Sequence, residues 1–184
     1  MRWDALFNDL ESQLQAATAL EQESEIRERT RAEQARLTLV QRLLGQVGRP
    51  LGVSTRGGRS LEGILTNVGS EWIAVTAEGR SVIVPLSSLH LLRGMGRGAG
   101  QPLSGVGARL GLGSALRVLS RDRAYVTLWT VSPPSRQAGI IDRVGADFVD
   151  VGTTGVDREG RQAQGRDVLT VPFASLDAVD AAAD

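Results

Sequence analysis

Arginine is the residue that best equips this chain to bind a ligand. All 21 basic residues are Arg, because the sequence contains no Lys, and 21 Asp and Glu balance them. Arg56 and Arg59 enclose two glycines, and Arg93 and Arg97 lie in the segment RGMGRG. A guanidinium group donates paired hydrogen bonds to phosphate oxygens, and Arg-Gly segments are typical of proteins that bind single strands. These four arginines are therefore our candidate nucleic-acid-binding residues.

The positive charge is concentrated in the middle of the chain. Residues 46–121 contain nine Arg and three acids, whereas residues 1–45 and residues 122–179 each contain six Arg and eight acids. The formal net charge is zero and the isoelectric point is near 6.6. This pattern indicates a central strip that binds phosphate. The alternative is that the first Arg-Gly segment is only a hairpin turn and the second only a flexible linker.

The residues that the chain lacks exclude several kinds of chemistry. Without Cys or Lys there is no thiol catalysis, thiolate metal site, phosphate-loop lysine or Schiff base. The single His, His90, cannot build a two-His metal site and is predicted to be structural. We therefore predict a non-enzymatic protein with no cofactor and no metal. No apolar run is long enough to span a membrane, and acids occupy the start of the chain, which predicts a soluble cytoplasmic protein.

An internal repeat indicates how the chain is organised. Residues 63–75 (GILTNVGSEWIAV) match residues 139–151 (GIIDRVGADFVDV), and residues 84–92 (VPLSSLHLL) match residues 171–179 (VPFASLDAV). Two matched blocks in the same order predict one compact unit that occurs twice.

Each copy is predicted to consist of short strands. Aliphatic residues alternate with turn signals, and Gly69 and Gly145 precede an acid and an aromatic residue in the same pattern. We expect a hairpin at each of these glycines, with the glycine supplying a positive φ. Roughly five short strands in about 50 residues, bent at glycines, predict a small β-barrel.

Helical segments are predicted before each barrel. The stretch from residue 3 to residue 44 contains neither Gly nor Pro, so one long helix and two shorter helices are both compatible with it. Trp3, Phe7, Leu10 and Leu14 form an apolar stripe at helical spacing. This stripe either packs on the chain's own barrel or binds a partner helix, so its four residues are candidate partner-binding residues.

The segment RGGRSLEGILTNVGSEWIAV (56–75) resembles the first motif of the Sm-like family, and VIVPLSSLHLLRG (82–94) resembles its fourth and fifth strands. The resemblance implies a mainly β fold with helices, in which an N-terminal helical segment precedes two Sm-like (SH3-like) small barrels. In this arrangement of two barrels, the chain is similar to an uncharacterised group of proteins from GC-rich bacteria. The expected division of the chain is a helical segment (1–45), a first barrel (46–94), a Gly-rich linker with a helix (95–121), a second barrel (122–179) and a tail (180–184).

The sequence thus predicts a non-catalytic binding module. RNA or another nucleic acid is the first ligand class, bound through Arg56, Arg59, Arg93 and Arg97. The alternative is a protein-interaction adaptor that uses the N-terminal helix and the barrel edges, and a dimer is one of its forms.

Overall fold

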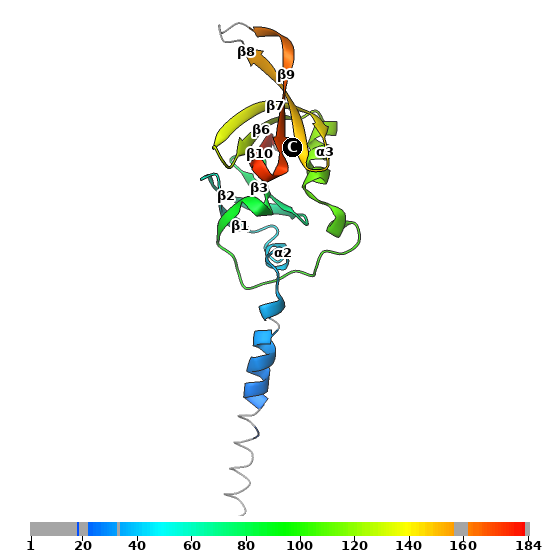
Figure 1. Ribbon diagram of the computed structural model, residues 1–184. Helices are drawn as coiled ribbons and strands as arrows, with labels where there is room; N and C mark the ends of the chain where they lie inside the picture. Colours follow the sequence, from blue (N-terminus) through cyan, green and yellow to red (C-terminus); the bar gives the residue numbers. More distant parts are fainter. Residues whose placement is uncertain (1–17, 19–21, 33, 157–161, 183–184) are drawn as a thin grey trace, which may run out of the picture. The chain divides into compact units, whose positions relative to one another are not determined.

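The computed structural model describes residues 18, 22–32, 34–156 and 162–182 (Figure 1). The chain divides into two units, residues 1–38 and residues 39–184. In the first unit, residues 22–32 and 34–36 are helical, and Arg27 donates a 3.0 Å hydrogen bond to Glu23 one turn earlier. Exposed pairs with this spacing stabilise a helix by about 0.2–0.5 kcal/mol. Residues 37 and 38 are not helical, so they separate this segment from the next helix.

The second unit is a ten-stranded antiparallel sheet with short helices, and its strands fall into two groups of five. The first half of the unit begins with helix α2 (Leu39–Leu44). Its strands are β1 (Pro50–Thr55), β2 (Ser60–Val68), β3 (Trp72–Ala77), β4 (Arg80–Pro85) and β5 (Leu89–Arg93), with a 3-10 turn η1 (Leu86–Ser88) between β4 and β5.

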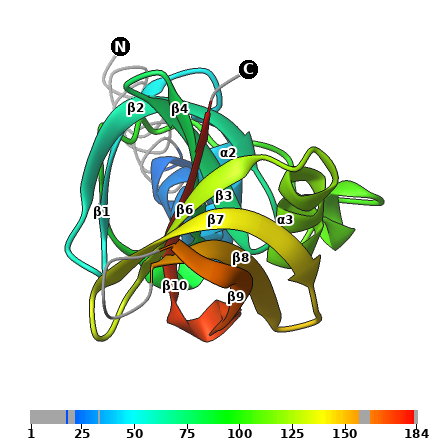
Figure 2. The same cartoon turned by 90° about the horizontal axis from the view of Figure 1, so that it is seen from above.

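The second half follows the turn η2 (Gly107–Arg109) and begins with helix α3 (Leu112–Arg121). Its strands are β6 (Tyr125–Thr130), β7 (Ser135–Val144), β8 (Phe148–Val156), β9 (Gln162–Pro172) and β10 (Leu176–Ala182), with the turn η3 (Phe173–Ser175) between β9 and β10. Figure 2 shows β1 and β2 curving away from the strands of this half.

The two halves have the same strand order. The sheet runs β5-β1-β2-β3-β4 in the first half and continues as β10-β6-β7-β8-β9 in the second, because β4 pairs with β10. The register also agrees, since Thr55 faces Leu89 where Thr130 faces Leu176, and both pairs are followed by an irregularity in the ladder. The prediction of a mainly β chain with helices is confirmed, but both halves belong to one continuous sheet.

Each half has its own hydrophobic core, closed by the helix that precedes it. Leu43 of α2 is fully buried in the first core, and Leu112 and Leu116 of α3 are buried in the second. In β1, the buried residues Leu51, Val53 and Thr55 alternate with the half-buried Gly52 and Ser54. Such alternation places one face of β1 on the core, because successive side chains of a strand point to opposite faces.

Glycine permits the closest crossing of strands in each half. A Cβ atom on Gly63 would lie 2.2 Å from the carbonyl oxygen of Thr76, and one on Gly139 would lie 2.3 Å from that of Gly152. Only a residue without a side chain fits where two backbones approach so closely. These glycines let β2 and β7 bend against β3 and β8.

Three sequence-based expectations need correction. Gly69 and Gly145 do not adopt a positive φ; instead, the rings of Trp72 and Phe148 lie over them, where a Cβ atom would clash at 2.3 Å. Residues 180–182 are not a tail, because β10 runs to Ala182 and pairs with β4 and β6. The helical segment 1–45 is divided, because α2 packs into the core of the first half.

Candidate nucleic-acid interface

Three of the four candidate arginines lie along β5, the strand at one open edge of the sheet. Arg56 follows β1 and hydrogen-bonds Ser87 and Ser88 just before β5, through its Nη1 (3.3 Å) and its backbone N–H (2.8 Å) respectively. Arg93 ends β5, and Arg97 follows four residues later; both side chains are exposed. A five-residue strand spans about 16 Å, so Arg56 and Arg93 lie at opposite ends of this edge.

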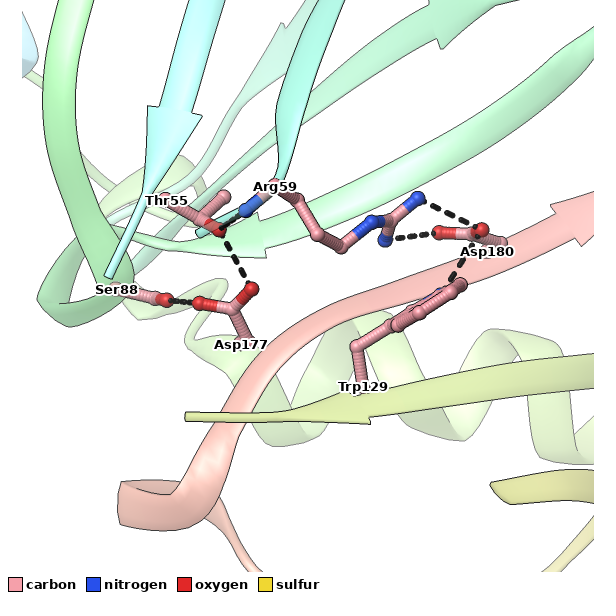
Figure 3. Close-up of polar contacts among 6 residues, drawn as sticks. All are labelled: Thr55, Arg59, Ser88, Trp129, Asp177 and Asp180. Atoms are coloured by element: carbon pink, nitrogen blue, oxygen red, sulfur yellow. Dashed lines mark hydrogen bonds and ion pairs between the residues drawn. The ribbon is translucent and has the colours of Figure 1, made fainter. Parts of the chain in front are cut away.

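The fourth candidate, Arg59, points away from this edge (Figure 3). Its Nη1 and Nη2 donate hydrogen bonds of 2.8 and 3.0 Å to the two carboxylate oxygens of Asp180, and its guanidinium carbon lies 4.2 Å from the ring centre of Trp129. The Arg59 side chain is 19% exposed and that of Asp180 is 6% exposed. A guanidinium bound in this bidentate way has little capacity left for phosphate. The structure therefore separates Arg59 from the other three candidates.

The Gly-rich segment after β5 is held against α2. Gln46, which is 1% exposed, accepts a 3.0 Å hydrogen bond from the N–H of Gly96 and donates one of 3.1 Å to the carbonyl of Gly98. A Cβ atom on Gly100 would lie 2.6 Å from Cβ of Leu44. Gly100 is therefore needed for close packing on the helix. The interpretation of this segment as a flexible linker is wrong.

Two further arginines reach the same segment. Nη2 of Arg42 donates a 3.1 Å hydrogen bond to the carbonyl of Gly96, and Nη1 of Arg49 lies 3.5 Å from where a Cβ atom on Gly96 would be. Gly96 directly precedes Arg97. We call Arg42, Arg49, Arg93 and Arg97 the arginine cluster. Within the described residues, none of the four forms an ion pair.

The segments that build this edge contain no acids. Residues 39–56 and 86–111 supply α2, β1, β5 and the connection to α3, and they contain six arginines and neither Asp nor Glu. The nearest acid in the ladder is Glu62, which faces Gly52 from one side while Arg93 faces it from the other. An anion that approaches the β5 edge therefore meets mainly positive charge.

Sequence reasoning missed Arg42 and Arg49 for identifiable reasons. Arg42 was assigned to the N-terminal helical segment, although its helix packs on the first half. Arg49 lies in the basic zone, but it is not part of an Arg-Gly pattern. A search of the sequence for long segments that contain Arg but no Asp or Glu would have found both residues.

The candidate partner-binding residues Trp3, Phe7, Leu10 and Leu14 lie outside the described residues. In the described part of the chain, no helix is both long and apolar enough to cross a bilayer. Among the same residues, no group of three His, Asp or Glu side chains is arranged to hold a metal ion.

A cavity of about 600 Å³ is lined by Arg59 and Trp129, among other residues. Its charged side chains are Arg59, Arg80, Arg136, Glu62, Glu78 and Asp180. Because the two signs are equally represented, this cavity does not favour an anion, in contrast to the β5 edge.

One carboxyl group in the second half has a clearly shifted pKa. Asp150 on β8 is 4% exposed, and the pKa of its carboxyl lies below the ordinary value of 3.8. The main cause is a 2.6 Å hydrogen bond from the Thr170 hydroxyl, followed by a 2.9 Å bond from Nε of Arg143, while burial acts in the opposite direction. Hydrogen bonds to the charged form favour it. Asp150 is therefore an anion held in a polar row across β7, β8 and β9.

No family model and no curated protein matches this chain.

Proposed function

We propose that this chain is a non-catalytic module that binds single-stranded RNA along its β5 edge. The observation that supports it most directly is the arginine cluster, which combines four arginines from α2, the turn after it, β5 and the following segment. Arg56 extends the same edge in the other direction. Phosphate contacts by Arg supply most of the affinity for a nucleic-acid backbone.

The fold supports this proposal by resemblance. The strand order fifth-first-second-third-fourth in each half is what two Sm-like barrels joined in tandem would give. Proteins of that family bind RNA, which is why RNA is the ligand class proposed here. The site itself differs from the family's pattern, because the acids Glu71 and Asp147 occupy the third loop of each half. The proposed contacts lie instead on the edge strand.

A salt titration tests the proposal. Binding of a fluorescently labelled single-stranded RNA is measured by anisotropy over a series of salt concentrations. Each phosphate contact contributes about −0.7 to the slope of log K against log salt for a single strand, so four contacts give a slope of about −2.8. The double substitution Arg93→Ala and Arg97→Ala should reduce the slope to about −1.4 and weaken binding at low salt.

The matched control carries Arg80→Ala and Arg136→Ala, two exposed arginines away from the β5 edge. It should bind RNA with the wild-type affinity and slope. Equal losses in both double variants would contradict a defined site, and an unchanged slope in the Arg93/Arg97 variant would remove the cluster from the interface. Tighter binding of single-stranded DNA of the same sequence would overturn the assignment to RNA.

A protein-interaction role is the second candidate function. The observation that favours it is the outer edge of β9, an 11-residue strand at the other end of the sheet, where Val168 is 50% exposed. An unpaired edge of this length can accept an extended segment of another protein. A partner that co-purifies should be lost on Val168→Pro if it adds to this edge, and on deletion of residues 1–20 if it binds the Trp3–Leu14 stripe. Retention in both variants contradicts this role.

A further inference from the structure

The contact between β4 and β10 joins the two halves, and we call it the seam. β10 runs antiparallel to β4, with Val179 opposite Ile83 and Asp180 opposite Val82. Within their own halves, β4 is the fourth strand and β10 the fifth. One fourth strand, β9, and one fifth strand, β5, remain at the open edges. Backbone geometry alone would therefore allow β9 of one copy to pair with β5 of another.

The seam is specified first by apolar side chains that cross it. Ile83 of β4 is 7% exposed and belongs to the core of the second half. Ala178 of β10 is fully buried and belongs to the core of the first half. Each core thus contains a side chain from the other half, so neither core is complete unless the two halves are paired.

The seam is specified further by two aspartates of β10 (Figure 3). Asp177, which is 1% exposed, accepts hydrogen bonds from the hydroxyls of Thr55 (2.6 Å) and Ser88 and from the N–H of Gly57 (2.8 Å). Asp180 binds Arg59, as described above, and also accepts a 3.1 Å bond from Nε1 of Trp129. Buried carboxylates require such donors, and these donors come mainly from the neighbouring half.

The strand registers show which residues occupy the same positions at the open edges. Thr130 corresponds to Thr55, and it pairs with Leu176 as Thr55 pairs with Leu89. Counting from these pairs and from the β3–β4 and β8–β9 ladders gives five counterparts: Thr170 for Ile83, Leu91 for Ala178, His90 for Asp177, Arg93 for Asp180 and Ser135 for Arg59.

None of the five seam side chains is kept at the open edges. Thr170 donates a hydrogen bond from its hydroxyl to Asp150. The β9 edge is therefore polar at the position where β4 carries the apolar side chain of Ile83. Leu91 is 46% exposed and is larger than Ala178, which fits a fully enclosed position. Where Asp180 meets Arg59, a second copy would bring Arg93 towards Ser135 and its neighbour Arg136, so the bidentate ion pair of the seam has no counterpart at the open edges.

The turn between β6 and β7 also lacks the donors that its counterpart, the turn between β1 and β2, supplies to the seam. The hydroxyl of Thr130 donates to the carbonyl of Pro133 in its own turn, whereas that of Thr55 donates across the seam. Pro133 and Pro134 have no N–H to replace that of Gly57.

From these differences we infer that Ile83, Ala178, Asp177, Asp180 and Arg59 specify pairing within the chain, and that their absence from the open edges prevents one copy from adding to another. The two halves of a chain thus recognise each other, while β5 remains open for a ligand. This inference does not depend on the proposed binding of RNA.

The test transplants the seam side chains to the open edges. The full chain with H90D, L91A, R93D, S135R and T170I carries all five, and a matched control carries the same changes with S135D in place of S135R. Light scattering after size exclusion gives the mass in solution. The wild type and the control should have the one-chain mass of 19.6 kDa, and the S135R variant should show a mass that rises with protein concentration.

Circular dichroism verifies that both variants are folded. Each substitution is also reverted singly in the S135R variant, so that masses are compared only between folded proteins. Wild-type chains of multiple mass that cross-link between β5 and β9 would overturn the inference. The same mass for the folded S135R and S135D variants would overturn it as well.

Discussion

β5 and β10 occupy the same position in the strand order of their halves, but their surroundings are opposite. β10 lies between β4 and β6 and carries Asp177 and Asp180, both buried. β5 is paired on one side only and carries His90 and Arg93 at the corresponding positions, both exposed. The same strand position therefore holds β10, which pairs with the other half of the chain, and β5, which presents an arginine to solvent.

Some features of the two halves belong to the backbone arrangement that they share, which we call the frame, and others belong to a single edge. A Cβ atom on Gly63 or on Gly139 would meet a carbonyl oxygen and a valine Cγ1 at corresponding positions, so both halves share this close crossing of strands. The side chains at the seam and at the open edges differ at five matched positions, although the ladders there are similar. These five positions therefore distinguish the seam from the open edges, where an unpaired strand could otherwise pair with another chain.

The largest difference is expected between Asp177→Ala and His90→Ala. Removing the Asp177 carboxylate leaves buried donors from Thr55, Ser88 and Gly57 without their acceptor. An unsatisfied buried donor costs about 1–3 kcal/mol, so we expect the free energy of unfolding to fall by about 3 kcal/mol. His90 is exposed, and its substitution should change stability by less than about 0.5 kcal/mol. Urea denaturation measures both, and equal effects would contradict the opposite roles of β5 and β10.

A matched pair of glycine substitutions tests the shared frame. In Gly63→Ala and Gly139→Ala, the added methyl group would meet a carbonyl oxygen at 2.2 and 2.3 Å. Overpacking of this kind costs about 1–3 kcal/mol, and we expect about 2 kcal/mol in each half. Chemical denaturation should give similar losses for the two variants. If one glycine tolerates alanine and the other does not, the two halves do not share one frame.

A double-mutant cycle measures the ion pair of the seam. Arg59→Ala and Asp180→Ala, made singly and together, should give a coupling energy of about 1.5 kcal/mol, since contacting residues couple by about 0.5–3 kcal/mol. The matched cycle at the open edges uses Ser135→Ala and Arg93→Ala, the counterparts of the same residues. That cycle should show no coupling in thermal or urea unfolding. Coupling in the open-edge cycle would mean that β5 and β9 meet in solution.

The sequence was most informative about elements whose positions depend on local pattern. The matched blocks around Gly63 and Gly139 cover parts of the strands β2, β3, β7 and β8, and each block contributes aliphatic residues to the core of its half. The reason assigned to Gly69 and Gly145 was wrong, because a φ angle and a packed ring both favour glycine and the sequence does not distinguish them.

The site was less predictable because it depends on contacts between distant segments. Arg59 and Arg56 belong to the same short turn, yet one side chain reaches Asp180, more than a hundred residues later, and the other lies by β5. Likewise, Gln46 holds residues 96–98 through hydrogen bonds that no local pattern indicates. Charge counting found the basic zone, but the assignment of each arginine to a surface required the sheet order.

The smallest expected effect is a difference in acid sensitivity between the two halves. The row Arg143, Asp150 and Thr170 of the second half corresponds to Asn67, Ala74 and Ile83 of the first, where no group can titrate. Because the pKa of Asp150 is lowered on folding, its charged form stabilises the fold above the ordinary value of 3.8, and this contribution is lost as the pH falls through the lowered value. The stability gap between the wild type and Asp150→Asn should therefore be largest near neutral pH and shrink in acid. Thr170→Val removes the main cause of the shift, so it should reduce the pH dependence of that gap more than Arg143→Ala does. Thermal unfolding measures this difference in stability. A difference that is constant with pH would show that the charge of Asp150 does not stabilise the fold, and the polar row would then not distinguish the open β9 edge from the seam.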